Sequence, residues 1–329
     1  MIESITNIFK AGLGLPGWRS NKVQKVVVTG GAGFIGSHLA EKLAERDNHV
    51  IVLDDFSTGK SENISRLDKK QDVAVIRGSV TDLPLLRSAF KGADYVFHLA
   101  AIASVPRSIK EPELSHTVNL TGTLNVLIAA RDSGVKKVVF SSSSAVYGDT
   151  PTLPQFEDML PGPQTPYAVA KLAAEYYCRA FQQVYSLSTV CLRYFNVYGP
   201  RQDPASQYAA AIPKFIKMIS SAQPPVIFGD GKQTRDFIYV KDVVQANLLA
   251  AESDSTGVFN IGSGKATTVN ELVGIITQRM GSNLKPVYEA ERSGDIKHSL
   301  SDISKAAAIG FKPEYSLEKG LWETILAFR

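Results

Sequence analysis

The segment VVVTGGAGFIG, residues 26–36, decides the fold of this chain. Its four β-branched residues favour a strand, and the glycines that follow favour a tight turn into a helix. In such a turn Gly30 permits the sharp bend, Gly33 lets a pyrophosphate approach the backbone, and Gly36 lets the helix pack closely on the strand. The spacing is G-x-x-G-x-x-G rather than G-x-G-x-x-G. We therefore expect this turn to bind a dinucleotide, with Phe34 and Ile35 beside it.

An acidic residue is expected about twenty positions further on, at the end of the second strand, and Asp54 lies there. A carboxylate at that place accepts hydrogen bonds from both ribose hydroxyls and repels a 2′-phosphate. The sequence therefore predicts NAD rather than NADP as the cofactor. The residues that follow, Asp55, Ser57, Thr58 and Gly59, are expected to contact the adenosine half.

From Val23 onward, short β-rich runs alternate with amphipathic stretches of helix length. The strand candidates are 25–29, 50–54, 73–77, 95–99, 137–141 and 188–193. The helix candidates are 36–46, 82–90, 113–133 and 166–185. Apolar strands separated by helices pair in parallel, with right-handed crossovers and helices on both faces. The sequence predicts an α/β fold with a Rossmann-type, doubly wound parallel sheet.

After Arg193 the repeating unit ends and proline and glycine become frequent. A helix at 240–252 and a strand at 258–261 are expected to return to the sheet. This predicts a NAD-binding domain from residues 23–193 plus about 239–262, and a smaller C-terminal substrate lobe from about 194–238 plus 263–329. The lobe should cover the carboxyl ends of the strands, where ligands of open α/β sheets bind. Residues 1–22 are expected to form an arm packed on the body, or alternatively a frayed terminus.

Composition and charge exclude several classes of protein. The net charge of +4 over 329 residues is too small to indicate a nucleic-acid partner, and no apolar run approaches a membrane span of about 18 residues. The only two cysteines, Cys178 and Cys191, are expected to be reduced core thiols, which is typical of a cytoplasmic protein. The five histidines are scattered, so no metal site is expected.

Tyr167 and Lys171 are predicted to share one face of the helix that follows Pro166, with Ser143 just past the strand before it. A free tyrosine has a pKa of about 10, so it must be lowered by roughly three units to act as a base near neutrality. An ammonium at about 4 Å contributes on the order of 4 kcal/mol at an effective dielectric constant of 20. A positively charged nicotinamide adds to that effect. Tyr167 is therefore expected to take a proton, relayed by Ser143 from a reacting hydroxyl.

Beyond these features, the chain resembles the extended short-chain dehydrogenase/reductase family, and within it the UDP-hexose 4-epimerases, most closely those that act on UDP-N-acetylglucosamine. The motifs that carry the resemblance are TGGAGFIG (29–36), HLAA (98–101), SSSSAVYG (141–148), YAVAK (167–171), LRYFNVYGPRQDP (192–204) and RDFIYVKD (235–242). The resemblance implies an isomerase with tightly bound NAD, a UDP-sugar substrate, and a homodimer formed through helices 113–133 and 164–186.

The resemblance also assigns roles to residues. Ser143, Tyr167 and Lys171 are the implied catalytic groups. Further cofactor contacts are implied for Ser79, Val80, Leu99, Ala100, Ala101, Asn119, Ser141 and Tyr194, together with Tyr167 and Lys171. Substrate contacts are implied for Ser104, Ser143, Ser144, Tyr167, Asn196, Gln202, Phe228, Arg235, Arg292, Asp295 and Ser299. The chain departs from the family pattern at Ser79, where the family has aspartate, and at Ala103, where N-acetyl-specific relatives have glycine.

Three alternative functions can be compared through the residues present. The related 4,6-dehydratases and decarboxylases have an acid where this chain has Ser144 and Ala145, which favours 4-epimerisation. The UDP-glucuronate 4-epimerases also lack that acid, so UDP-glucuronate 4-epimerase is the alternative function. A non-catalytic NAD-sensing scaffold would have no need of Tyr167 and Lys171.

Ser299 stands seven positions after Arg292, where related epimerases have a residue that gates the sugar pocket. A small residue there is expected to admit both N-acetylated and plain UDP-hexoses.

Overall fold

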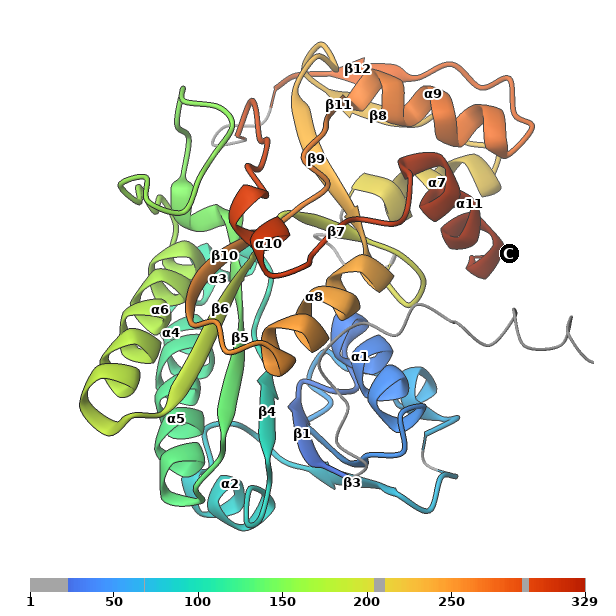
Figure 1. The fold of residues 1–329 in the computed structure, drawn as a ribbon. Coiled ribbons are helices and arrows are strands. Elements are labelled where there is room, and N and C mark those ends of the chain that lie inside the picture. Colours follow the sequence, from blue (N-terminus) through green and yellow to red (C-terminus); the bar gives the residue numbers. More distant parts are fainter. Residues whose placement is uncertain (1–22, 68, 204–210, 292–295, 329) are drawn as a thin grey trace, which may run out of the picture.

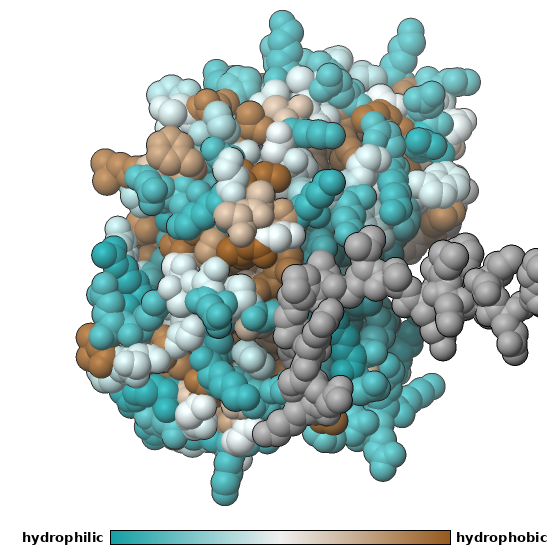
Figure 2. Space-filling model, viewed as in Figure 1, coloured by the Kyte–Doolittle hydropathy of each residue, from teal (hydrophilic) through white to brown (hydrophobic). Residues whose placement is uncertain are grey.

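The structure is a computed structural model that describes residues 23–67, 69–203, 211–291 and 296–328. The expected arm at 1–22 and the residues Arg292 and Asp295 lie outside these ranges. In the part of the chain that the structure describes, no helix is both long and apolar enough to cross a membrane. On the face seen in Figure 2, hydrophobic residues occur in small groups between hydrophilic ones.

A seven-stranded sheet forms the centre of the molecule, and every neighbouring pair of its strands is parallel. The strand order is β10 (Gly257–Ile261), β6 (Ser188–Tyr194), β5 (Lys137–Ser143), β4 (Tyr95–His98), β1 (Lys25–Thr29), β2 (His49–Asp54) and β3 (Val73–Arg77). The predicted Rossmann-type fold is confirmed, and the expected strands differ from these only by one or two residues at their ends.

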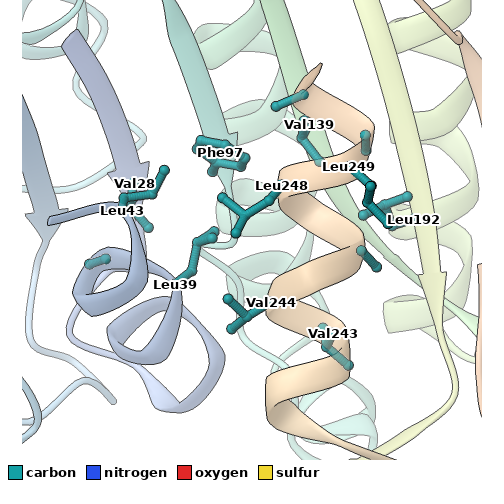
Figure 3. Close-up of a cluster of buried hydrophobic side chains, with 14 of the residues drawn as sticks. Val28, Leu39, Leu43, Phe97, Val139, Leu192, Val243, Val244, Leu248 and Leu249 are labelled. Atoms are coloured by element: carbon teal, nitrogen blue, oxygen red, sulfur yellow. The ribbon is translucent and has the colours of Figure 1, made fainter. Parts of the chain in front are cut away.

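Helices cover both faces of this sheet (Figure 1). One face packs against α1 (Phe34–Ala44) and α8 (Val240–Glu252), and the other against α2 (Leu83–Ala89), α5 (Gly122–Asp132) and α6 (Pro166–Tyr185). Figure 3 shows the first core: Val28, Phe97, Val139 and Leu192 of the strands meet Leu39 and Leu43 of α1 and Val243, Val244, Leu248 and Leu249 of α8. Complete burial of such side chains contributes about 1.5–3 kcal/mol each.

The helix expected at 113–133 is interrupted. It consists of α4 (Pro112–His116), a π-helical turn η2 (Thr117–Thr121) and α5, and a short helix α3 (Val105–Lys110) precedes it. The π turn places Asn119 so that its side chain reaches the loop after β4. By contrast, α6 and α8 have the bounds expected from the sequence. The short 3₁₀ helices η1 (Ser61–Ile64) and η3 (Ser144–Tyr147) follow β2 and β5.

A second group of elements lies over one end of the sheet (Figure 1). It contains the three-stranded sheet β11 (Ala266–Thr268), β9 (Thr234–Tyr239) and β7 (Asn196–Tyr198), and the pair β8 (Val226–Phe228) and β12 (Val287–Glu289). Its helices are α7 (Ala211–Ser220), α9 (Val269–Arg279) and α11 (Leu317–Ala327), which share one hydrophobic core with β9. The short helix α10 (Ser304–Ala308) packs beside β10.

Candidate active site

The glycine turn lies where the strand order reverses, between β1 and β4. Gly30 has a φ of +68°, and its N–H donates to the carbonyl oxygen of Leu53 over 2.8 Å. A Cβ atom added at Gly30 would lie 2.6 Å from the backbone nitrogen of Ala100, after β4. A side chain is therefore excluded where two backbone segments converge, which is the place at which a dinucleotide binds in such sheets.

A cavity of about 430 Å³ opens at this edge of the sheet, a size typical of small-molecule sites. It is lined by most of the residues expected to bind the cofactor and by all three expected catalytic residues. These are Gly30, Gly33, Phe34, Ile35, Gly36, Asp54, Asp55, Ser57, Thr58, Ser79, Val80, Leu99, Ala100, Ala101, Ser141, Ser143, Tyr167, Lys171 and Tyr194.

Asp54, at the end of β2, braces the glycine turn as well as facing the cavity. Its carboxylate oxygens accept hydrogen bonds from the backbone N–H groups of Ala32 (2.9 Å) and Phe56 (2.8 Å). Burial raises the pKa of Asp54, and these two hydrogen bonds oppose that effect. Gly59 does not line the cavity. A Cβ atom there would lie 2.8 Å from the Asp54 carboxylate, so Gly59 makes room for Asp54 instead.

Asn119 and Ser104 make hydrogen bonds to the backbone of the segment after β4. The Asn119 side chain accepts from the N–H of Ile102 (2.8 Å) and donates to the Ile102 carbonyl (3.1 Å), and it does not line the cavity. The Ser104 hydroxyl accepts from the N–H of Arg107 and caps α3. Both residues lie beside the cavity wall that Ile102 and Ala103 form.

The three expected catalytic residues come from two adjacent elements. Ser143 ends β5, and its hydroxyl accepts from the N–H of Ala145 (3.2 Å) at the start of η3. Tyr167 and Lys171 lie one turn apart at the start of α6, which Thr165 caps. The Lys171 ammonium lies 5.9 Å from the centre of the Tyr167 ring. The structure thus brings the three side chains to one end of the cavity.

Burial dominates the electrostatics of this group. It raises the pKa of Tyr167, against a hydrogen bond with Ser143 that lowers it, and it lowers the pKa of Lys171 to about 8. The lowering of the Tyr167 pKa expected from the sequence depends on Lys171 and oxidised NAD together, and in the protein alone burial raises that pKa. The physical reason is that both side chains are nearly inaccessible, so loss of hydration is the largest cause of each pKa shift.

A second cavity of about 260 Å³ adjoins the first, because Val197 of β7 lines both. Asn196, Phe228 and Arg235, three of the expected substrate residues, line it. Lys214 of α7 lines it too, with its ammonium 5.4 Å from the centre of the Phe228 ring. No motif in the sequence pointed to Lys214, since its position depends on how α7 packs against β8.

The other expected substrate residues are dispersed. Gln202 lines the first cavity, whereas Ser144, in η3, and Ser299 line neither. Ser299 is buried, and its N–H donates to the carbonyl oxygen of Thr234 at the start of β9 (3.2 Å). Arg292 and Asp295 are among the residues that the structure does not describe.

Sequence reasoning missed five polar residues of the first cavity, Lys60, Asn63, Ser142, Arg201 and Asp203. Lys60 and Asp203 form an ion pair of 3.3 Å between the loop after β2 and the segment after β7. The buried atoms Arg201 Nη1 and Gln202 Oε1 find no hydrogen-bond partner among the described residues. These polar groups suit a charged, hydrogen-bonding ligand such as a dinucleotide. Across residues 23–67, 69–203, 211–291 and 296–328, no cluster of His, Cys, Asp or Glu could hold a metal ion.

Comparison with known proteins adds to this geometry. The model of the NAD dependent epimerase/dehydratase family matches residues 26–262. The UDP-glucose 4-epimerase of Mycolicibacterium smegmatis is 37% identical over 310 residues, covering 93% of this chain and 98% of that protein.

Two solved structures are similar over nearly the same length. The UDP-N-acetylglucosamine 4-epimerase of Methanobrevibacter ruminantium, in complex with UDP-N-acetylmuramic acid, is 48% identical with a TM-score of 0.91, covering 93% of this chain and 98% of that one. The UDP-glucose 4-epimerase of Thermus thermophilus, in complex with NAD, is 37% identical with a TM-score of 0.85, covering 93% of this chain and 99% of that one.

Proposed function

The chain belongs to the NAD dependent epimerase/dehydratase family, and from that premise we propose that it interconverts UDP-N-acetylglucosamine with UDP-N-acetylgalactosamine, and UDP-glucose with UDP-galactose. The reaction class is 4-epimerisation of a UDP-sugar, an isomerisation that uses NAD. UDP-glucuronate remains the alternative substrate, because its 4-epimerisation needs the same catalytic groups.

One observation carries the proposal: Ser143, Tyr167 and Lys171 line the same cavity as the glycine turn and Asp54. A scaffold that only senses NAD needs the turn and the acidic residue but no buried tyrosine and lysine beside them. The adjoining cavity supplies an aromatic ring at Phe228 and cationic groups at Lys214 and Arg235, which suit a pyrimidine and a diphosphate. We propose residues 194–238 and 263–329 as the substrate lobe on this basis.

The chain's own groups then act as follows. Tyr167 takes the proton of the sugar 4′-hydroxyl, directly or through Ser143, and later returns it. NAD, held by the glycine turn and Asp54, would supply the acceptor and donor of the C4 hydride, and its positive charge would lower the pKa of the nearby phenol. The C4–O bond becomes a carbonyl and then an alcohol again, and C4 is inverted when the hydride returns to the opposite face of the sugar. Lys171, fastened to the Ser141 carbonyl, holds its positive charge next to Tyr167.

Inversion requires that the 4-keto sugar present its other face to the same groups. The protein must therefore hold the nucleotide tightly and the sugar loosely. The division into two cavities supports this, since Phe228, Lys214 and Arg235 line the second cavity and the reacting groups line the first. The N-acetylated sugar is proposed because position 299 holds a small residue, Ser299, whose side chain is buried and lines neither cavity.

A homodimer in the cytoplasm completes the proposal. Large hydrophobic side chains are exposed along α4 and α6, namely Leu114, Val169, Tyr176, Tyr177 and Val184. These positions fall in the two segments, 113–133 and 164–186, proposed to pair in the dimer. Cys178 and Cys191 are free and buried, as expected in a reducing compartment. Light scattering on the purified chain tests the dimer directly.

The test of the function has two steps. The protein is purified without added cofactor and denatured, and the released nucleotide is identified. The native protein is then assayed with UDP-glucose, UDP-N-acetylglucosamine and UDP-glucuronate side by side. We expect bound NAD and epimerisation of the first two sugars without net consumption of cofactor. Stoichiometric oxidation of added NAD(P)H would instead identify a reductase and end the proposal.

A further inference from the structure

A single buried carboxylate connects α6 and β5, the two elements that carry the reacting groups, with the neighbouring strand β6. Glu175 of α6 accepts hydrogen bonds from the Ser142 hydroxyl of β5 and from two nitrogens of Arg193 of β6, Nε at 2.9 Å and Nη2 at 2.7 Å. The Glu175 and Arg193 side chains are only 5% and 4% exposed. Ser142 and Arg193 are directly paired across the sheet.

The three partners stand next to the residues of the proposed reaction. Glu175 follows Lys171 by one helical turn and Tyr167 by two, so all three share one face of α6. Ser142 lies between Ser141, whose carbonyl binds Lys171, and Ser143. The contacts of Glu175 therefore join the strand end that carries Ser143 to the helix that carries Tyr167 and Lys171.

Arg193, the partner of Glu175 in this cluster, is held in place by contacts of its own. The Arg193 guanidinium lies 4.7 Å from the centre of the Tyr147 ring, and its Nη1 donates to the carbonyl oxygen of Glu157 (3.3 Å). The Tyr147 hydroxyl in turn donates to Asn260 of β10 (2.6 Å). Arg193 thus has little freedom to move away from Glu175, and the direction of the Glu175 carboxylate is set by the sheet.

Packing of α6 against the sheet does not require a buried ion pair. A buried ion pair is commonly no more stabilising than apolar side chains of similar volume, whereas it has stricter geometric demands. Bidentate pairing fixes both distance and orientation. We propose that Glu175 is a positioning residue: through Ser142 and Arg193 it fixes the distance between Ser143 and the Tyr167–Lys171 pair. This inference rests on the proposed function.

The decisive variant is the double replacement Glu175→Leu with Arg193→Met, which exchanges the ion pair for apolar side chains. We expect a melting temperature near that of the unaltered protein, normal content of NAD and a KM for the UDP-sugar within about twofold. We expect kcat to fall by about 10- to 100-fold, since displacement of catalytic groups by about 1 Å has effects of that size. The rate at which bound NAD is reduced after mixing with UDP-sugar should fall in parallel.

Two single variants keep the test decisive if the double variant does not fold. Ser142→Ala removes only the hydrogen bond between β5 and the Glu175 carboxylate, and it should lower kcat by a few-fold with unchanged KM. Thr189→Val is the matched control, because it removes a buried hydrogen bond from β6 to the Cys178 carbonyl of α6 (3.0 Å), farther along the helix from the site. It should lower the melting temperature without changing kcat.

A double variant, or Ser142→Ala, that folds and keeps the kcat of the unaltered protein would overturn the proposal. So would a loss of kcat in Thr189→Val as large as that in Ser142→Ala, since the effect would then be one of general packing. Failure of the proposed function itself looks different, because the unaltered protein would then show no epimerisation of any UDP-sugar.

Discussion

The ammonium of Lys171 donates a hydrogen bond to the backbone carbonyl of Ser141 over 2.6 Å, which ties helix α6 to the end of β5. The lysine is 2% exposed, and loss of hydration lowers its pKa to about 8. A lysine with a folded-state pKa below its unfolded value costs stability wherever it must be protonated. The site therefore places a destabilising charge beside Tyr167.

Lys171→Met should for this reason raise stability while lowering activity. The fall in pKa from 10.5 to about 8 corresponds to about 3 kcal/mol, at about 1.4 kcal/mol per pKa unit. Loss of the bond to Ser141 offsets about 1 kcal/mol of this. We expect urea unfolding at pH 7 to show a gain of about 2 kcal/mol, with kcat greatly reduced.

The sign of the pH dependence provides a check on this prediction. Between pH 8 and 10.5 the unfolded chain binds more protons at this lysine than the folded one, so this group makes the unaltered protein more stable as pH rises. The advantage of Lys171→Met should accordingly shrink across that range. An advantage that is constant with pH would show that the charge of Lys171 is not its source.

Tyr167→Phe should lower kcat by several orders of magnitude and leave nucleotide affinity almost unchanged, because only the transfer of a proton is lost. Ser143→Ala should have a smaller effect, since Tyr167 can take the proton directly. Steady-state kinetics with UDP-glucose measure both. Near-normal turnover of Tyr167→Phe would remove the phenol from its assigned role.

Gly30→Ala should abolish cofactor binding and destabilise the fold by more than about 2 kcal/mol, through contact with backbone atoms and a strained φ. The added Cβ would lie 2.6 Å from Ala100 N and 2.7 Å from Ala100 Cα. Gly92→Ala is the matched control: its φ is +72°, but a Cβ there meets nothing within 4 Å. It should cost only about 1 kcal/mol and keep NAD, as measured by thermal unfolding and cofactor content. Equal effects of the two variants would contradict the role of the close approach at Gly30.

Asp54→Asn should weaken retention of NAD and allow NADP to bind. The amide removes the charge that repels a 2′-phosphate, and it can accept only one of the two bonds from Ala32 and Phe56. Asp55→Asn is the control, because Asp55 also lines the cavity but accepts from Ser57 N–H instead. Isothermal titration of the cofactor-free protein compares the two dinucleotides. If Asp54→Asn prefers NAD as strongly as before, another residue of the loop makes the distinction.

How far the sequence predicts this molecule depends on how local each feature is. Helix α6 has the expected bounds because Thr165 and Pro166 are strong local start signals. The π turn at 117–121 was not expected, and its residue Asn119 is hydrogen-bonded to Ile102 in another segment, a contact that only the folded chain makes. Lys60, Asp203 and Lys214 were missed for the same reason: only the folded chain brings them to the cavities.

The same distinction applies to Tyr167 and Lys171. Their spacing and the helix that carries them follow from the sequence, and the structure places both in one cavity. Their pKa values do not follow from spacing. They depend on how deeply the neighbouring strands and helices bury each side chain, and that burial moves the pKa of Tyr167 upwards.

The last prediction concerns the size of the sugar. Ser299 is 6% exposed and is hydrogen-bonded through its backbone to Thr234, the residue before Arg235 of the second cavity. Its side chain is thus enclosed rather than directed to solvent, and a phenol ring in its place must displace neighbouring groups, among them the start of the strand that carries Arg235. Ser299→Tyr should therefore lower kcat/KM for UDP-N-acetylglucosamine by about 5- to 150-fold and spare UDP-glucose, because overpacking costs about 1–3 kcal/mol. Ser299→Ala, the control, should leave the ratio of kcat/KM for the two sugars unchanged. If Ser299→Tyr lowers kcat/KM for both sugars equally, with a lowered melting temperature, then Ser299 is a packing residue and the N-acetyl assignment loses its main support.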